Sequence, residues 1–319
     1  MPTISVIIPT HNRSRALRRT IASVLRQTMP DFELIVVDDA SVDDTQRVVE
    51  HFASANIKYI CHAKNQGAAA ARNTGISNSH GKYIAFLDDD DEWLPDKLRL
   101  QFARLEASPM NVGAIYTGWL IVHGLTGNVL SQQIPWLKGD VFDSIFVRGF
   151  IAPTSTFLCR RSCFEKVGLF DESLQYCEDH DMWLRIAKEF AVDCVDEPLV
   201  RYTDPDSDRP SLSTNYDRVI RGQEAYFRKY AHVFVRHPAI HSVRRVELGV
   251  LYCYNGNMSK GRASFRTAMR INALEPRTYF NFALSLLGAR LFKTLKLSKE
   301  RCLLFLKTSA RTRDCQLTN

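Results

Sequence analysis

The chain has 319 residues, of which 45% are hydrophobic, so it exceeds one average domain and can bury a sizeable core. Its eight cysteines include no C-x-x-C pair, which argues against a zinc site or a disulfide framework. No apolar run reaches the roughly 18 residues that a membrane span needs, and no signal peptide precedes the first predicted strand. We therefore expect a cytoplasmic α/β protein with an appended region.

The net charge of +7 is unevenly distributed. Residues 205–319 hold 21 Lys and Arg against 8 Asp and Glu, whereas residues 1–204 hold 21 against 27. This asymmetry predicts a domain at 1–204 and a separate basic region at 205–319. A nucleic-acid-binding protein could explain the pI near 9.0, but no RNA- or DNA-binding motif occurs and an acidic strand edge would repel phosphates. We expect no nucleic-acid partner.

Residues 1–110 alternate short apolar runs with amphipathic patterns. The predicted strands are 4–9, 32–37, 57–61 and 83–87, and helices are expected after each of them. Such alternation predicts a mainly parallel sheet whose ligand site lies outside the carboxyl ends of the strands. Polar residues cluster at those ends: Thr10, His11 and Asn12, then Asp38 and Asp39, then Asp88 to Asp91. Neither G-x-G-x-x-G nor a P-loop is present, so the predictions of a dinucleotide-binding site and of a P-loop phosphate site lose their main support.

The four consecutive aspartates at 88–91 follow a buried strand. Carboxylates this close repel one another unless a cation or several donors lie among them. Oxygen ligands favour Mg²⁺ or Mn²⁺, which often keep positions open for substrate phosphates. The alternative is a solvated acidic turn that caps the helix starting near Pro95.

The middle of the chain supplies a second group of carboxylates. Residues 112–122 are extended, residues 154–159 are predicted to form a strand, and residues 178–190 a helix with one apolar face. Glu178 and Asp179 fall at the start of this helix, where the dipole favours anions. The spacing of Asp181 to Arg185 is that of an i,i+4 salt bridge.

Five segments in this order resemble family-2 glycosyltransferases of the GT-A fold over residues 3–200. The segments are VIIPTHN, VVDDASVDDT, NQGAAAARNTGI, FLDDDDEWLPDKL and the E-D of YCEDHDMW. The resemblance implies a GT-A α/β fold, with a nucleotide-binding sheet flanked by helices at about 1–110 and an acceptor half at about 111–204. It implies a nucleotide-diphosphate sugar donor, with UDP favoured, and a saccharide or lipid-linked acceptor in polysaccharide or glycan assembly.

The resemblance also assigns roles to residues. Asp39 would accept the uracil N3–H, and His11 would stand where the family often has an aromatic ring against the base. Asp90 would bind Mn²⁺ or Mg²⁺, with Asp89 nearer the ribose. The other residues assigned to the nucleotide sugar are Thr10, Asn12, Asp38, Arg72 and Asp88. Two plainer alternatives remain open: Arg72 only pairs with an aspartate, and Asn73 only caps a turn.

By the same resemblance Asp179 is the general base that takes the acceptor proton, because an oxygen nucleophile is weak until its proton is removed. Glu178 would orient the acceptor, and Asp181 is the rival base. The implied reaction is a metal-assisted single displacement with inversion. The Q-x-x-R-W motif of processive synthases is absent, which favours transfer of one sugar at a time. The alternative is a non-catalytic nucleotide-sugar-binding module.

The region after a polar connector at 204–215 is predicted to be helical. Residues 246–272 read as two helices around Gly256 and Asn257, like a tetratricopeptide hairpin. Residues 278–307 form a predicted amphipathic segment that could contact an anionic membrane surface or pack on the hairpin. Its apolar residues are Phe280, Ala283, Leu284, Leu287, Leu291 and Leu295, and its basic ones are Arg290, Lys293, Lys296, Lys299, Arg301 and Lys307.

Overall fold

The computed structural model describes residues 1–52, 57–148, 151–174, 176–204 and 216–295. The chain divides into two compact units, Met1–Ser211 (unit 1) and Leu212–Asn319 (unit 2). Most of the predicted connector at 204–215, and residues 296–307 of the predicted amphipathic segment, lie outside the described residues.

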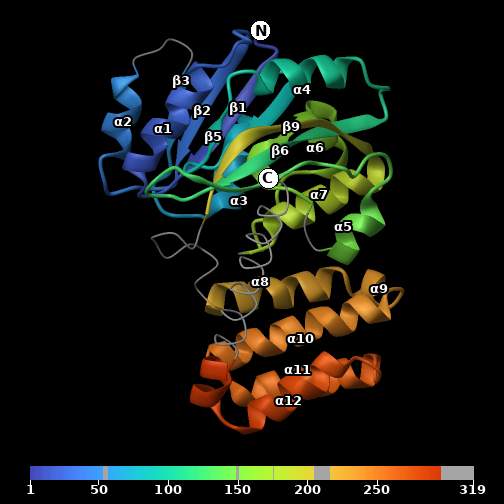
Figure 1. Cartoon of the computed structure of the whole chain (residues 1–319). Coiled ribbons are helices and arrows are strands. Elements are labelled where there is room, and N and C mark those ends of the chain that lie inside the picture. Colours follow the sequence, from blue (N-terminus) through green and yellow to red (C-terminus); the bar gives the residue numbers. More distant parts are fainter. Residues whose placement is uncertain (53–56, 149–150, 175, 205–215, 296–319) are drawn as a thin grey trace, which may run out of the picture. The chain divides into compact units, whose positions relative to one another are not determined.

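The first half of unit 1 alternates strands and helices, as predicted (Figure 1). Its elements are β1 (Ile4–Thr10), α1 (Ser14–Leu25), β2 (Phe32–Asp38), α2 (Thr45–His51), β3 (Ile57–Cys61), α3 (Ala68–Ser77) and β4 (Tyr83–Phe86). The four strands are parallel and lie in the order β3-β2-β1-β4. Thr10 pairs in register with Asp38, and Asp38 with Cys61, so the polar carboxyl ends of the strands meet on one edge.

The second half of unit 1 extends this sheet. Its elements are β5 (Glu92–Trp93), α4 (Lys97–Glu106), β6 (Val112–Val122), β7 (Val129–Gln133), α5 (Phe142–Arg148), a 3₁₀ helix (Thr154–Thr156), β8 (Phe157–Arg160), α6 (Arg161–Val167), α7 (Glu178–Glu189) and β9 (Ala191–Thr203). The described strands form one nine-stranded mixed sheet in the order β3-β2-β1-β4-β8-β6-β9-β5, with β7 beside β6. β8 runs antiparallel to both β4 and β6, which joins the parallel half to the second half.

Helices cover both faces of the sheet. Buried side chains of α1, α2 and α4 pack with alternate residues of β1 and β2, such as Val6 and Leu34, in the main core. Ile35 and Val37 face the other side, where they pack with Ala71 of α3. α3 lies so close to β1 that a Cβ on Gly75 would come within 2.4 Å of the Ile7 side chain. This three-layer packing fixes the strand ends that carry the polar residues.

The predicted strand at 154–159 is wrong in its first half. Residues Thr154–Thr156 form a 3₁₀ turn, and β8 begins only at Phe157. The cause is local, because both the backbone N–H and the hydroxyl of Thr156 donate to the Pro153 carbonyl, at 3.0 and 2.7 Å. Side-chain bonds of this kind compete with strand pairing.

Unit 2 is helical in its described part. Its helices are α8 (Tyr216–Lys229), α9 (Ala231–Phe234), α10 (Pro238–Tyr254), α11 (Met258–Ile271) and α12 (Pro276–Leu286). The predicted hairpin is confirmed: α10 and α11 flank Gly256, whose φ is +84°, and the Asn257 side chain accepts from the N–H of Lys260. A Cβ on Gly261 would lie 2.4 Å from the Cys253 sulfur, so the two helices pack closely.

The predicted single amphipathic face beginning at 278 is interrupted. α12 ends at Leu286, and Gly288 at φ +88° breaks the helix before residues 289–295 become helical again. Leu284 and Phe292 are buried in the core of unit 2, whereas Leu287 and Leu291 are 54% and 52% exposed. No helix among the described residues has the length and apolar character needed to cross a bilayer.

Candidate active site

Strained backbone marks the carboxyl edge of the sheet. Among the described residues, the non-glycine residues with positive φ are Asn12, Ala40 and Cys177, with φ of 54°, 62° and 66°. Asn12 follows β1, Ala40 follows β2, and Cys177 directly precedes Glu178 and Asp179 at the start of α7. Such conformations cost free energy and gather at functional sites. All three lie next to residues that the sequence assigned to the site.

Asp39 is held by three donors. Its carboxylate accepts from the backbone N–H groups of Gln66 and Gly67 at 2.8 and 2.7 Å, and lies 2.8 Å from Nδ1 of His62. The other ring nitrogen of His62 lies 2.9 Å from the Thr74 hydroxyl. Asp39 is 3% exposed, so its direction is fixed. Sequence analysis missed His62, which follows β3 as Asp39 follows β2.

Asp38 has the contacts of a structural residue. It is 2% exposed, accepts from the backbone N–H of Ser41 at 2.8 Å, and receives the Tyr59 hydroxyl. Burial and the adjacent Asp38 raise the pKa of Tyr59, so this hydroxyl stays protonated and donates. Asp38 therefore shapes the β2 end of the edge.

The residues after β1 join the β1 and β2 ends of the edge. The backbone N–H of Asn12 donates to the Ser41 hydroxyl at 2.8 Å, and its side-chain oxygen accepts from Val42 at 2.8 Å. The carbonyl of Thr10, which is 4% exposed, accepts from the N–H of Asp39 at 2.8 Å. His11 stands between Thr10 and Asn12 in the sequence. Its Nε2 lies 2.9 Å from the side-chain amide nitrogen of Asn12.

Arg72 connects the two carboxylate groups that the sequence identified. From α3, its Nη2 donates to Asp88 at 2.8 Å and its Nη1 to Glu178 at 3.2 Å, while the guanidinium lies over the Phe170 ring. Burial alone would lower the pKa of Arg72, but the charges of Asp88 and Glu178 outweigh it and raise the pKa. Arg72 thus pairs with an aspartate, as the plainer alternative has it, and also with Glu178.

Asn73 likewise has a structural contact. Its amide donates to the Phe170 carbonyl at 2.9 Å and to Glu172 at 2.8 Å, and its oxygen accepts from the Phe170 N–H at 2.8 Å. Asn73 thereby fixes the backbone of Phe170, whose ring lies against Arg72.

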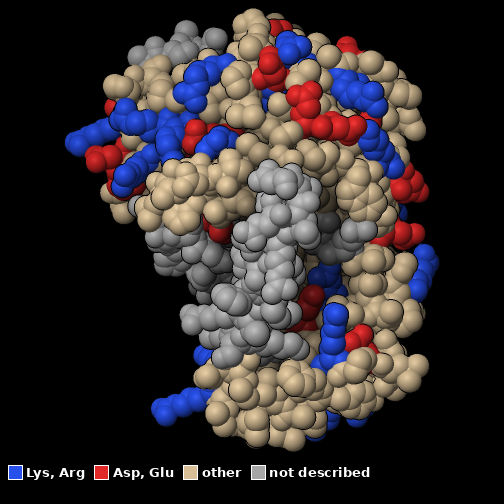
Figure 2. Space-filling model, in the orientation of Figure 1, with Lys and Arg blue, Asp and Glu red and all other residues tan. Residues whose placement is uncertain are grey.

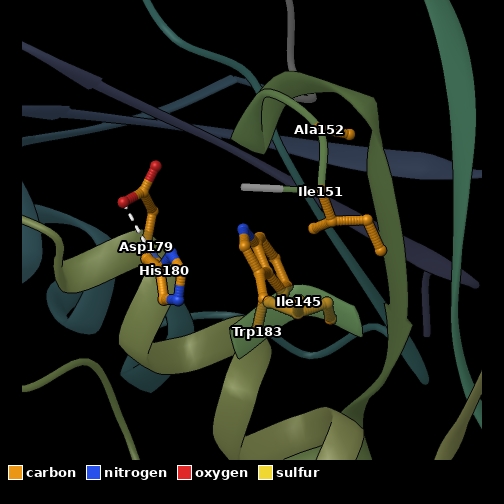
Figure 3. A pocket seen from close by; sticks show the side chains of 6 residues that line it. All are labelled: Ile145, Ile151, Ala152, Asp179, His180 and Trp183. Carbon is orange, nitrogen blue, oxygen red and sulfur yellow. Dashed lines mark hydrogen bonds between the residues drawn. The ribbon is translucent and has the colours of Figure 1, made fainter. Parts of the chain in front are cut away.

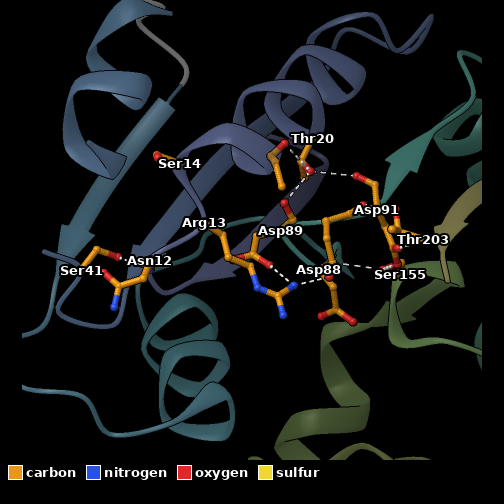
Figure 4. Close-up of polar contacts among 12 residues, drawn as sticks. Asn12, Arg13, Ser14, Thr20, Ser41, Asp88, Asp89, Asp91, Ser155 and Thr203 are labelled. Atoms are coloured by element: carbon orange, nitrogen blue, oxygen red, sulfur yellow. Dashed lines mark hydrogen bonds and ion pairs between the residues drawn. The ribbon is translucent and has the colours of Figure 1, made fainter. Parts of the chain in front are cut away.

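Asp89 and Asp90 share a cationic partner from another loop. Nη1 of Arg13 lies 3.3 Å from Asp89 (Figure 4). The same nitrogen is paired with Asp90. Burial and the nearby charge of Asp90 raise the pKa of Asp89 to about 7, and burial also raises the pKa of Asp90. Arg13 belongs to the HNRS segment, but sequence analysis gave it no role, because its distance from 89 and 90 in the chain hides the contact.

Asp91 faces away from this pair. It is 1% exposed, receives the Ser155 hydroxyl at 2.6 Å and accepts from the N–H of Thr203 at 3.0 Å. The Thr20 hydroxyl is shared between the carbonyls of Asp89 and Asp91, at 2.9 and 2.8 Å. The fourth aspartate therefore anchors the turn to β9.

Asp179 lies beside a small cavity. The cavity is lined by Asp179, Ile145, Ile151, Ala152, His180 and Trp183 (Figure 3). Trp183 is stacked on Phe157 with ring centroids 3.8 Å apart, and its buried indole N–H has no partner among the described residues. Burial raises the pKa of Asp179, while the charge of Arg72 opposes that rise. A carboxylate beside an unpaired donor and apolar walls suits a sugar hydroxyl.

Asp181 has a different environment from Asp179. It is fully buried and receives Nε of Arg185 at 2.8 Å. The other nitrogens of Arg185 donate to the carbonyls of Val167 and Leu169 at 2.7 and 2.9 Å. This network fastens α7 to the end of α6.

The carboxylates fit a divalent cation only if a ligand completes the shell. No group of three or more His, Cys, Asp or Glu in the described part of the chain could hold a metal by itself. Asp89 and Asp90 nevertheless converge on one nitrogen of Arg13, so their oxygens already face a single cation. Mg²⁺ is commonly held by one or two carboxylates together with substrate phosphates and water. The donor set fits such an ion.

Comparison with known sequences shows which protein family the chain resembles. The profile described as Glycosyl transferase family 2 matches residues 5–168. An uncharacterized glycosyltransferase of Rickettsia felis is 35% identical over 197 residues, covering 61% of this chain and 32% of that protein. The UDP-Glc:alpha-D-GlcNAc-diphosphoundecaprenol beta-1,3-glucosyltransferase of Escherichia coli is 37% identical over 132 residues, covering 41% and 51%. The chain spans about a third of the length of the first Rickettsia relatives.

Solved structures show the same fold. S. aureus TarS 1-349 in complex with UDP-GlcNAc has a TM-score of 0.59 at 17% identity, covering 94% of this chain and 92% of that one. The mannosyltransferase PcManGT of Pyrobaculum calidifontis, in complex with GDP-Man and Mn²⁺, has a TM-score of 0.56 at 18% identity, covering 91% and 86%. At these identities the likeness bears on architecture alone. It confirms the predicted GT-A fold.

Proposed function

Because this chain belongs to glycosyltransferase family 2, we propose that it transfers a sugar from a UDP-sugar donor to a hydroxyl of a saccharide or lipid-linked acceptor, with inversion. The observation that carries the proposal is the position of Arg72, which contacts Asp88 and Glu178. It unites the carboxylates after β4 with those at the start of α7. One group can hold the donor while the other faces the acceptor.

The donor end of the proposed site is built on the β1, β2 and β4 ends. Asp39 would accept the N3–H of uracil with the one lone pair that its three protein donors leave. The strained residues Asn12 and Ala40 follow β1 and β2 at this end of the proposed site. Asp89 and Asp90 would hold Mn²⁺ or Mg²⁺, which when bound supplies the positive charge that neutralises the departing diphosphate. The neighbours' UDP-GlcNAc and Mn²⁺ support this assignment.

The proposed chemistry is a single displacement. The acceptor oxygen forms a bond to the anomeric carbon as the bond from that carbon to the diphosphate breaks, and UDP leaves with the electron pair. Asp179 takes the acceptor proton. Glu178, paired with Arg72, lies beside it and can accept a hydrogen bond from a second acceptor hydroxyl. Trp183 and Ile145, which line the small cavity beside Asp179, would give the acceptor an apolar contact.

One relative and the surface of unit 2 support the proposed acceptor class. The E. coli relative is named for an undecaprenol-linked acceptor, which supports a lipid-linked acceptor here. Residues 216–295 hold 14 Lys and Arg against four Asp and Glu, and Phe280, Leu287, Leu291 and Leu295 are each about half exposed. On its visible face in Figure 2, much of unit 2 is uncharged. We therefore retain reversible contact with an anionic membrane as part of the proposal.

A donor screen with and without metal tests the proposal. The chain would be incubated with UDP- and GDP-sugars, Mn²⁺ and candidate acceptors, and released nucleoside diphosphate and glycosylated product would be measured. We expect metal-dependent release that rises when an acceptor is present, and an acceptor-dependent part that is about 10²–10⁴-fold lower in Asp179→Asn. Binding of a nucleotide sugar without any release would instead identify a non-catalytic binding module.

A further inference from the structure

Arg13 occupies the position where two carboxylates converge. A single nitrogen, Nη1, contacts both Asp89 and Asp90. The Arg13 side chain is 30% exposed, against 10% for Asp89 and 34% for Asp90, so the pair is neither a surface contact nor sealed in the core. The guanidinium therefore fills the space between the carboxylates that a metal ion would use.

The backbone under Arg13 is fixed while its side chain is long. Asn12, with φ of 54°, is tied through its N–H to Ser41 and through its side chain to Val42. On the other side, the N–H of Ser14 donates to Asp43 at 3.0 Å. The loop is thus anchored on both sides of Arg13. The guanidinium can therefore move away from the aspartates by rotation about the side-chain bonds of Arg13.

The aspartates are fixed as well. Thr20 binds the carbonyls on either side of Asp90, and Asp91 is anchored by Ser155 and Thr203. Asp89 and Asp90 cannot easily separate to relieve their repulsion, so a nearby cation must relieve it. Burial alone would lower the pKa of Arg13, but the charges of Asp90 and Asp89 raise it. Arg13 is the cation that the chain itself supplies.

We propose that Arg13 is an internal counter-ion of Asp89 and Asp90 that a divalent metal must displace. This inference rests on the proposed function, because it assigns the same two carboxylates to the metal. The same oxygens cannot face both cations at close range, so metal and guanidinium compete. Arg13 thereby weakens binding of metal in the absence of donor. Once displaced, its planar fork is suited to phosphate oxygens of an incoming diphosphate.

The test measures Mn²⁺ alone, without nucleotide, so that it does not depend on transfer activity. Binding to wild type, Arg13→Gln and Arg18→Gln would be followed by the electron paramagnetic resonance signal of free Mn²⁺ at fixed pH and ionic strength. Arg18 is an exposed residue of α1. Arg18→Gln therefore removes the same charge as Arg13→Gln without removing a contact to the aspartates. We expect Mn²⁺ to bind about tenfold more tightly to Arg13→Gln, equivalent to about 1.4 kcal/mol, and within twofold of wild type to Arg18→Gln.

Two further variants keep the outcome decisive. Arg13→Lys retains the charge but lacks the fork, so its affinity for Mn²⁺ should fall between those of wild type and Arg13→Gln. Adding Asp90→Asn to Arg13→Gln should abolish the gain, which locates the ion at the aspartates. Unchanged or weaker Mn²⁺ binding by a folded Arg13→Gln would overturn the inference. If the gain is found but no sugar is transferred, the inference stands and the proposed function fails.

Discussion

Arg72 and Glu178 are 106 positions apart in the chain, yet Nη1 of Arg72 lies 3.2 Å from Oε1 of Glu178. The same guanidinium binds Asp88 through Nη2. Its charge therefore lies between the residues proposed to face the donor and those proposed to face the acceptor. A buried cation with two anionic partners positions both, and its loss would leave each without its partner.

Replacing Arg72 should destabilise unit 1. Removing one partner of a buried ion pair typically costs about 3–5 kcal/mol, and because Asp88 is partly exposed we expect about 3 kcal/mol for Arg72→Met. Urea unfolding followed by circular dichroism would measure the loss. The double variant Arg72→Met/Glu178→Gln should recover part of it, because the stranded carboxylate is then gone. A single variant within about 0.5 kcal/mol of wild type, the usual range for surface substitutions, would contradict this role.

Asp179 and Asp181 should differ in what their loss changes. Asp179→Asn should keep UDP binding but reduce transfer by 10²–10⁴-fold, the contribution of a general base. Asp181→Asn should lower the thermal midpoint, because it breaks the pair with Arg185 in a fully buried position. Steady-state transfer and thermal unfolding of both variants separate the roles. Transfer by Asp179→Asn within threefold of wild type would move the base to Asp181.

The metal-free protein should lose stability as pH rises from about 4 to 7. Asp89 has its pKa raised to about 7 by burial and by the charge of Asp90, against 3.8 ordinarily. Between these values the folded chain binds more protons than the unfolded chain, so the free energy of unfolding falls with rising pH. In EDTA, Asp89→Asn should show a smaller fall than wild type over this window. Equal slopes for the two proteins would refute the assignment.

Asp90→Asn should uncouple nucleotide from metal. One carboxylate fewer leaves the diphosphate poorly neutralised, so Mn²⁺ should no longer tighten UDP binding. Calorimetric titration of UDP with and without Mn²⁺ measures this directly. Asp91→Asn is the matched control, because Asp91 is turned toward Ser155 and Thr203. Equal enhancement by Mn²⁺ in wild type and Asp90→Asn would remove Asp90 from the metal site.

The parallel half of unit 1 could be predicted because its signals are local. Each of its first strands is a continuous apolar run that ends in polar residues, and both features can be read from the sequence. β9 (Ala191–Thr203) was missed because Asp193, Asp196 and Glu197 interrupt its apolar pattern. It pairs with β6 through shifts in register that no local pattern indicates.

The site could be predicted in its residues but not in its contacts. Which aspartate faces a ligand depends on partners from distant elements: Arg13 selects Asp89 and Asp90, while Ser155 and Thr203 turn Asp91 away. His62 can donate a hydrogen bond to Asp39 only because β3 lies beside β2. Such pairings are set by the sheet order, which spacing along the chain does not reveal.

The last prediction concerns membrane contact by unit 2. A truncation before residue 278 would be a poor test, because Leu284 and Phe292 fill the core of the helical hairpin. The exposed residues offer a better one: Leu287→Ser/Leu291→Ser should weaken flotation with phosphatidylglycerol vesicles at low salt at least tenfold, since each buried CH₂ contributes about 0.8 kcal/mol. Leu274→Ser is the control, because Leu274 is 91% exposed but precedes α12.

Charge provides the second half of this test. Each basic residue near an anionic surface contributes about 1 kcal/mol, so Arg290→Gln/Lys293→Gln should also reduce flotation, and high salt should abolish it through screening. Neutral phosphatidylcholine vesicles should not bind the wild-type chain. If the wild-type chain stays in the soluble fraction with anionic vesicles at low salt, unit 2 does not bind the membrane. The exposed leucines then have another role, and a lipid-linked acceptor reaches the site without help from unit 2. If the leucine variant floats as well as Leu274→Ser, the basic residues alone account for the binding.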